Sequence, residues 1–359
     1  MTNGTTFIPF SKIIGQDKAV QFLKQVMAGE KLPHAYLFVG IQGIGKTTTA
    51  LALTRAINCR EPVSEEGCGR CPSCRQVMSG NFPDLEQISP EGNRIKIDQI
   101  RQLSRAFGFK PVSGKYRVSI IQSADRMTEE AANAFLKTLE EPPEGNILIL
   151  NVKEPLGLLE TIVSRCQKVP FRPIPVDLIA DWLKEKKQLD DEQALLLAKI
   201  SEGSLGRAFN MSEGDFLERR QDYLFKLIKL PGLSSDQALN MILEVTEKNK
   251  KKALDPSGND GILGMLSVWK AWYRDLLLMN ISGPEKLLLN IDFSHKLKTI
   301  AKNCNIKDIM KSFQVLDVAQ RDLLRMRNLD LVMENAVLTL RGLTREKPVH
   351  HRRQHTPDE

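Results

Sequence analysis

The sequence lacks any run of about 18 apolar residues, so none of its segments is predicted to span a membrane. Its first residues lack a basic segment followed by an apolar one, so we expect no signal peptide and a cytoplasmic protein. No internal repeat or concentrated basic or aromatic stretch is apparent, and the net charge of +7 is spread along 359 residues. A pI near 9.0 is compatible with work near nucleic acid but does not predict direct DNA contact.

Cysteine is also scarce, and it is unevenly distributed. Of six cysteines, four lie close together as Cys59-x8-Cys68-x2-Cys71-x2-Cys74. In a reducing compartment such clustering favours a metal site over disulfides. Four thiolates form the ligand set of a tetrahedral structural Zn²⁺ site and leave no open position for a reacting water. We therefore predict a structural zinc module at about residues 59–81, the alternative being four unrelated thiols.

A phosphate-binding loop is predicted between an apolar run and a helix-forming run. Residues 36–39 are apolar, Gly-x-x-x-x-Gly-Lys-Thr follows them, and residues 48–55 favour a helix. Glycines let backbone N–H groups face phosphate oxygens, the lysine adds a positive charge, and the threonine hydroxyl can bind Mg²⁺. The predicted nucleotide-binding residues are Gly40, Gly43, Gly45, Lys46, Thr47 and Thr48. The motif predicts a site able to take ATP or ADP with Mg²⁺, the alternative being a glycine-rich turn without a ligand.

Strand-like and helical runs alternate through the first half of the chain. Helical patterns at residues 95–107 and 128–140, the second capped by Thr128, are followed by β-branched runs at residues 117–122 and 147–151. This alternation predicts a parallel sheet covered by helices on both faces. Prolines in residues 171–175 mark a boundary, after which only helical periodicity is found. The sequence therefore predicts an α/β domain followed by all-helical domains.

An acidic pair is absent where an ATPase of this type needs one. Such an enzyme carries two acids at the end of the second core strand, one to hold Mg²⁺ through water and the next to polarise the attacking water. Here the strand runs into Gln122 and Ser123, and Asp125 comes too late for either role. Neither an amide nor a hydroxyl accepts a proton at neutral pH. We therefore expect nucleotide binding to persist and efficient hydrolysis, the intrinsic ATPase activity, to be lost.

Several motifs together resemble the bacterial clamp-loader family of AAA+ ATPases, most closely its delta-prime branch in DNA polymerase III. The matching segments are residues 14–16, residues 32–40 with the phosphate loop, the four-cysteine knuckle, and residues 124–125, 133–143 and 164–166. The resemblance is specific over roughly residues 8–210 and architectural beyond them. It implies an AAA+ core with the zinc module (1–172), a small helical lid (173–212), an all-α collar for oligomerisation (213–345) and a disordered tail (346–359).

In this family, five subunits form an arc that opens a ring-shaped sliding clamp and closes it on primed DNA during replication. The resemblance implies a hetero-pentamer with gamma/tau and delta subunits, within the DNA-directed DNA polymerase holoenzyme. The arginine of Ser-Arg-Cys, here Arg165, is implied to reach the γ-phosphate of ATP bound by the neighbouring subunit. Such an arginine finger stabilises charge on the transferring phosphoryl group. Without the flanking motif, a surface arginine or an intramolecular ion pair would be the default interpretation.

Two departures from the ATP-hydrolysing relatives favour an inert role. Those relatives carry Asp–Glu in place of Gln122 and Ser123, and a sensor arginine directly after Gly-Ser-Leu, where this chain has Gly206 and then Arg207. We therefore expect a delta-prime-type stator that binds nucleotide without hydrolysing it and donates Arg165. The alternatives are a gamma/tau-type motor subunit and a helicase-like remodeller, which would need a concentrated basic or aromatic surface.

Overall fold

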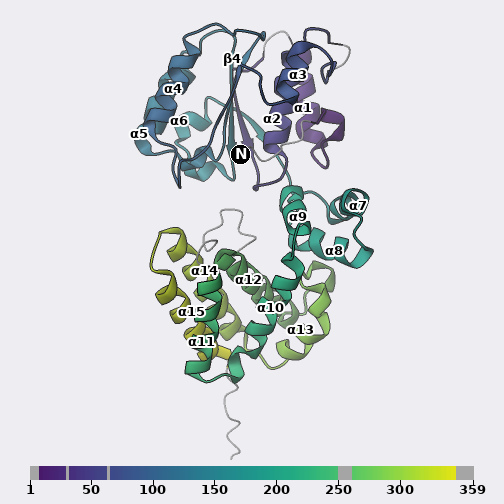
Figure 1. Cartoon of the computed structure of the whole chain (residues 1–359), viewed down its shortest axis with the longest axis vertical. Coiled ribbons are helices and arrows are strands. Elements are labelled where there is room, and N and C mark those ends of the chain that lie inside the picture. The colour runs from purple at the N-terminus through teal and green to yellow at the C-terminus, as the bar shows by residue number, and fades with distance from the viewer. Residues whose placement is uncertain (1–7, 30–31, 63–64, 250–260, 345–359) are drawn as a thin grey trace, which may run out of the picture. The chain divides into compact units, whose positions relative to one another are not determined.

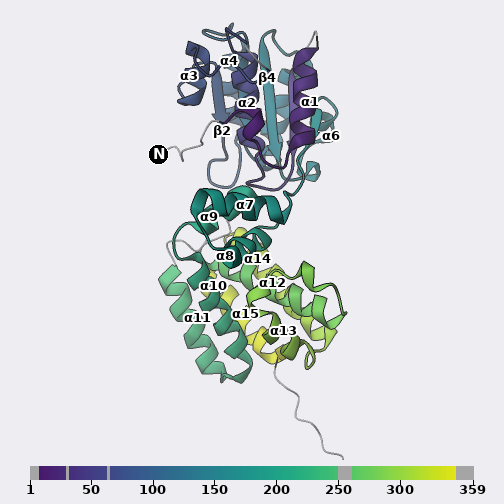
Figure 2. The same ribbon diagram turned by 90° about the vertical axis from the view of Figure 1, so that its right-hand side faces the viewer.

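The computed structural model describes residues 8–29, 32–62, 65–249 and 261–344 (Figure 1; Figure 2). The chain divides after Ala208 into two compact units. The first unit combines a parallel sheet with helices, and the described part of the second unit consists of helices and their connections. This confirms the fold class predicted from the alternation of sequence patterns.

The first unit is built on a five-stranded parallel sheet with the strand order β2-β3-β4-β1-β5. The strands are β1 (Ala35–Val39), β2 (Leu85–Ile88), β3 (Arg117–Ile121), β4 (Asn146–Val152) and β5 (Gln167–Pro170). β1 pairs with both β4 and β5, so that Leu37 lies opposite Leu150 on one side and Lys168 on the other. Because the strands are parallel, their carboxyl ends lie at one edge, where ligands of such sheets bind.

Helices cover both faces of this sheet. The helices of this part of the chain are α1 (Asp17–Ala28), α2 (Lys46–Ile57), α3 (Pro72–Met78), α4 (Ile97–Phe107), α5 (Glu129–Glu140) and α6 (Glu160–Val163), of which α3 packs on α2. Figure 1 shows α4 and α5 on one side of the sheet and α1 and α2 on the other. Leu37 and Leu150 join Leu103 of α4 and Phe135 of α5 in one buried apolar cluster. Coverage of both faces explains why the central strands are buried and largely apolar, with polar exceptions such as Ser119 and Asn151.

Three helices follow the sheet: α7 (Val176–Lys187), α8 (Asp191–Ile200) and α9 (Leu205–Ser212). α7 and α8 pack against each other, and the first unit ends within α9. These helices correspond to the predicted lid. The division into domains 1–172, 173–212 and 213–345 stays a prediction, and the predicted tail 346–359 lies outside the described residues.

The second unit packs its helices around α12 (Gly261–Asn280). The others are α10 (Phe216–Lys229), α11 (Ser235–Asn249), α13 (Ser294–Ala301), α14 (Ile306–Leu324) and α15 (Leu329–Thr344). α12 contacts α10, α13 and α14, which is why it carries buried residues on most of its circumference. Its Trp269 is completely buried and donates its indole N–H to the backbone oxygen of Tyr223 at 2.8 Å.

The sequence patterns predict β1, β3 and β4 correctly, and Thr128 caps α5 as expected by accepting a hydrogen bond from the N–H of Ala131. They do not predict β2 or β5. Both are edge strands, with polar or charged residues such as Glu86 and Lys168 that hide the apolar pattern. None of the described helices has both the length and the apolar character needed to cross a membrane.

Candidate nucleotide and metal sites

The predicted phosphate loop connects the carboxyl end of β1 to the first turn of α2. Gly45 occupies the position before the helix with φ of 107°, a conformation that favours glycine, and Lys46 is the first helical residue. The first N–H groups of a helix have no partner within it, and the helix dipole adds a partial positive charge there. The six predicted residues, from Gly40 to Thr48, thus form one continuous cradle suited to an anion.

Lys46 is folded back over this loop. Its ammonium donates hydrogen bonds to the backbone oxygens of Gly40 and Ile41, the second at 2.8 Å. Burial lowers the pKa of Lys46 to about 8, against the opposing influence of the Asp125 charge, which raises it. The lysine therefore titrates close to neutral pH, and a phosphate group would have to draw its ammonium away from the two carbonyls.

Thr47 belongs to a cluster of three side chains at the edge of the sheet. Its hydroxyl donates to Gln122 Oε1 at 3.0 Å, just beyond the end of β3. Asn151 of β4 donates its Nδ2 to both partners, at 3.2 Å to Thr47 Oγ1 and 3.1 Å to Gln122 Oε1. Gln122 therefore lies beside the threonine, where the sequence comparison expects an acid. We call this group the Thr47–Gln122–Asn151 cluster.

Asn151 is a site residue that the sequence reasoning does not identify. It is 1% exposed and lies within β4, where Asn146 at the start of the strand is the other polar residue. Its backbone lies opposite Phe38 of β1, and its side chain reaches Thr47 across 104 positions of sequence. The one available signal is an asparagine within a buried strand, which demands hydrogen-bond partners.

The amino end of α9 rests on the phosphate loop. The N–H of Gly206 donates to the backbone oxygen of Gly43 at 2.8 Å, and the hydroxyl of Ser204 donates to the backbone oxygen of Gln42 at 2.8 Å. A Cβ atom at Gly206 would lie 2.9 Å from the Cα of Gly43, closer than real Cβ contacts come. The backbones therefore approach so closely that an arginine does not fit at position 206. Arg207 instead forms an ion pair with Glu202 at 2.9 Å.

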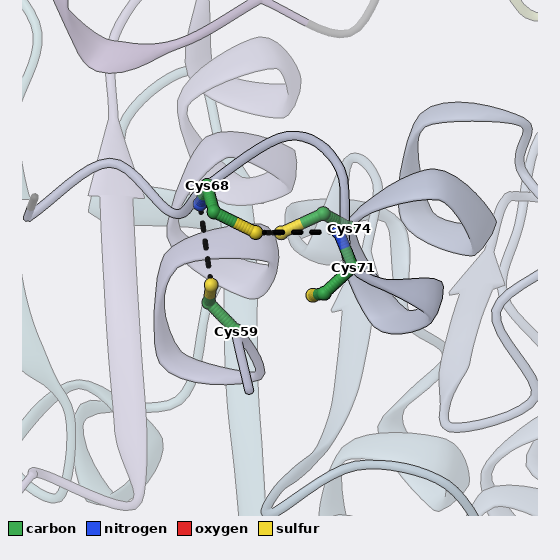
Figure 3. A group of neighbouring side chains, drawn as sticks. All are labelled: Cys59, Cys68, Cys71 and Cys74. Atoms are coloured by element: carbon green, nitrogen blue, oxygen red, sulfur yellow. Dashed lines mark hydrogen bonds between the residues drawn. The ribbon is translucent and has the colours of Figure 1, made fainter. Parts of the chain in front are cut away.

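The four clustered cysteines converge as the sequence predicts (Figure 3). Cys59 follows the end of α2, Cys68 and Cys71 lie before α3, and Cys74 belongs to α3. Their sulfur atoms all lie within 4.8 Å of one another. Zn–S bonds of about 2.3 Å in a tetrahedron separate the sulfurs by roughly 3.8 Å, so small shifts suffice to hold a Zn²⁺ ion.

Backbone N–H groups support a charged form of this cluster. The N–H of Cys68 donates to the sulfur of Cys59, and the N–H of Cys71 donates to the sulfur of Cys68, both at 3.2 Å. The bond from Cys71 is the main cause that lowers the pKa of Cys68 to about 6, so this sulfur is a thiolate at neutral pH. Burial raises the pKa of the Cys74 thiol. Of the four cysteines, Cys74 therefore depends most on a bound cation for its ionisation. The donor set therefore fits a structural zinc ion.

Arg165 lies on the surface, in the turn between α6 and β5. Its guanidinium is 2.9 Å from Glu140 Oε1 and donates to the backbone oxygen of Thr161 at 3.0 Å. The side chain of Arg165 is 37% exposed and that of Glu140 is 51% exposed. Exposed pairs of this kind contribute about 0–1 kcal/mol, so little holds the arginine to its own chain.

The chain is similar to several known proteins. Residues 15–175 match the family model described as DNA polymerase III, delta subunit. The chain is 32% identical to subunit delta′ of DNA polymerase III from Bacillus subtilis over 330 residues, which cover 90% of this chain and 96% of that protein. Identity to delta′ of Escherichia coli is 32% over 190 residues, or 52% of this chain and 57% of that subunit. Identity to tau of Escherichia coli is 31% over 252 residues, or 68% of this chain and 39% of tau.

Replacing Cys71 by Ser should abolish stoichiometric zinc in the purified chain, because a hydroxyl does not replace a buried thiolate ligand. Structural zinc supplies binding free energy on the order of 10 kcal/mol to folding, so the first unit should also unfold at a lower temperature. Metal content is measured by atomic emission and unfolding by calorimetry. Cys304→Ser, which lies outside the cluster, is the matched control and should keep its zinc. Unchanged metal in Cys71→Ser would refute the assignment.

ADP binding should weaken as the pH rises from 7 to 9, because Lys46 loses its charge near pH 8. If the protonated lysine is the form that binds phosphate, the dissociation constant should increase by about tenfold over this interval. Titration calorimetry of the full chain at several pH values measures the change. Lys46→Arg keeps its charge throughout and should give a flat profile. A wild-type profile as flat as that of Lys46→Arg would contradict the role of Lys46.

Proposed function

Because this chain belongs to the clamp-loader family of DNA polymerase III subunits that includes delta′, gamma and tau, we propose that it is a delta′-type stator. In this role it binds nucleotide without hydrolysing it and donates Arg165 to an ATPase neighbour. The observation that carries the proposal is the contact of Gln122 with Thr47 at 3.0 Å, at the place where hydrolysing relatives carry an acid.

The chemistry of hydrolysis explains why this contact matters. Phosphoryl transfer to water needs a group that orients and polarises the attacking water next to the terminal phosphate. The amide of Gln122 and the hydroxyl of Ser123 do not accept a proton near neutral pH. Asp125 follows in the short helix η2 (Ala124–Arg126) and takes no part in the Thr47–Gln122–Asn151 cluster. The site keeps groups that bind phosphate and lacks those that would activate water.

The contact between α9 and the phosphate loop supports the same assignment. A sensor arginine directly after Gly-Ser-Leu would stand at position 206, where the backbone of Gly43 leaves no room for a side chain. Arg207, one position later, is held by Glu202. A second cation for the terminal phosphate is therefore not supplied from this position.

Arg165 is suited to act outside its own chain. Its planar guanidinium is a cation that can bind two oxygens of a phosphoryl group at once. The weak surface pair with Glu140 holds it near the turn after α6 without burying it. A neighbouring subunit that brings ATP close to this turn can therefore exchange the carboxylate of Glu140 for a γ-phosphate.

The family relationship also suggests the partners of this chain, its location and the ligands that it binds. The chain would join gamma/tau and delta subunits in a cytoplasmic hetero-pentamer that loads the sliding clamp onto primed DNA. The all-helical second unit would form the collar that holds the subunits together. Zn²⁺ would bind the four clustered cysteines, and ATP or ADP would bind the phosphate loop.

A gamma/tau-type motor subunit is the second candidate. It is favoured by the intact loop from Gly40 to Thr48 and by the similarity to tau. The two candidates differ in one property, which is whether this chain hydrolyses ATP at its own site.

Purified alone, the chain should bind ATP without turning it over, because no residue of the site can activate water. Turnover should appear in the reconstituted assembly. In an assembly whose other ATP sites are disabled, Arg165→Ala should reduce hydrolysis by the neighbour by roughly 10³-fold, the usual contribution of an arginine finger. Phosphate release measures both quantities.

Two variants control this experiment. Glu140→Gln removes the intramolecular pair but keeps Arg165, so its assembly should hydrolyse ATP at least as fast as the wild type. Arg165→Lys keeps the charge without the planar fork and should retain only part of the activity. Turnover by the isolated chain would establish the motor role instead, and an unaffected rate in Arg165→Ala would remove the finger assignment.

A further inference from the structure

The fold implies that nucleotide reaches the phosphate loop together with Mg²⁺, and the side chains around Thr47 test this expectation. Phosphate-loop ATPases hold the ion with the loop hydroxyl and with an acid on a neighbouring strand. Mg²⁺ is a hard cation that gives up its water reluctantly, and in nucleotide sites it is bound through one or two carboxylates together with the substrate phosphates. A site that keeps the ion therefore needs negative charge next to Thr47.

The Thr47–Gln122–Asn151 cluster offers no such charge. The hydroxyl of Thr47 has one proton and two lone pairs, and the proton is used by Gln122 Oε1 at 3.0 Å. One lone pair faces the Nδ2 group of Asn151 at 3.2 Å. The oxygen that should bind a cation is thus paired with a hydrogen-bond donor.

The conclusion that a hydrogen-bond donor faces the Thr47 oxygen does not depend on which way the side-chain amides of Gln122 and Asn151 are turned. Asn151 Nδ2 lies 3.1 Å from Gln122 Oε1, so turning over one amide alone would bring two oxygens or two nitrogens together. Turning over both would let Gln122 supply the N–H that faces Thr47. In either arrangement an amide N–H points at the threonine oxygen, where its partial positive charge opposes a cation.

Two charged groups act on each other near the loop. The charge of Asp125, in η2, acts on Lys46, and the buried oxygen Asp125 Oδ1 has no hydrogen-bond partner among the described residues. The buried oxygen Asn151 Oδ1 has no hydrogen-bond partner among the described residues, but it is neutral. A neutral amide oxygen attracts Mg²⁺ too weakly to replace one of its bound waters. The phosphate groups of the nucleotide can be bound by the ammonium of Lys46 and by the first backbone N–H groups of α2.

From this donor set we propose that the phosphate loop binds nucleotide in a metal-free form. The amides of Gln122 and Asn151 occupy the positions beside Thr47 where Mg²⁺ and its ligands would otherwise lie. The inference rests on the nucleotide binding in the proposed function. It makes metal-free ADP a better ligand than metal-free ATP, because the additional phosphate brings negative charge that no further cation meets. It also gives a second reason why this site would not hydrolyse ATP, because phosphoryl transfer uses the metal ion to neutralise developing charge.

The test is the affinity of the full-length chain for ADP in excess EDTA and in excess MgCl₂, measured by titration calorimetry. The apparent dissociation constant of the wild type should be at least about threefold higher in MgCl₂ than in EDTA, because excess Mg²⁺ chelates ADP and withdraws its metal-free form. Gln122→Glu places a carboxylate in the same position, and there Mg²⁺ should strengthen ADP binding by about tenfold or more. Gln193→Glu makes the same chemical change on the exposed surface of α8 and should behave like the wild type.

Manganese gives a second measurement that does not depend on affinity. Mn²⁺ added with ADP should give the paramagnetic resonance spectrum of the free Mn–ADP complex with the wild-type chain, and a protein-bound spectrum with Gln122→Glu. The inference is overturned if the wild type binds ADP more tightly in MgCl₂ than in EDTA, if the wild type holds Mn²⁺, or if ADP binds in neither condition. Metal-dependent binding without turnover would leave the stator role intact, whereas turnover by the isolated chain would remove the stator role itself.

Discussion

The pairing of β1 with two parallel neighbours is the constraint on which the nucleotide site depends. β1 lies between β4 and β5, so its carboxyl end is fixed from both sides. The next strand beyond β4 is β3, which ends at the same edge. The loop that leaves β1 therefore starts at the same edge of the sheet as the residues that follow β3 and β4. This arrangement brings Thr47, Gln122 and Asn151 within hydrogen-bond distance.

Helix α2 extends this order from the sheet to the cysteines. It starts at Lys46 in the phosphate loop and ends at Ile57, two positions before Cys59. All of its residues from Thr49 to Arg55 are buried, so both ends are held by the same packed segment. Arg55 adds a direct link, because its guanidinium donates to the backbone oxygen of Glu66 in the cysteine-bearing insertion at 3.0 Å. The two candidate sites are thus opposite ends of one rigid element.

The sequence reveals those parts of the molecule whose signals are local. The phosphate loop, the four cysteines and the central strands follow from spacing within short windows, and the structure confirms that the cysteines converge. The edge strands β2 and β5 escape detection because only part of their surface is buried. The role of Asn151 and the loop contact of Gly206, which the sequence shows only as a departure from relatives, are not predicted for another reason. Their partners lie on distant segments, and only folding shows that an asparagine completes the Thr47 cluster and that a glycine touches the loop.

The contact between Gly206 and Gly43 limits which side chains position 206 can carry. An arginine there requires more than a substitution, since the Cβ atom alone would lie 2.9 Å from the Cα of Gly43. The loop and the amino end of α9 would first have to separate. Position 122, by contrast, already holds a side chain of the size of glutamate beside Thr47. An acid is therefore easier to introduce at position 122 than an arginine at position 206.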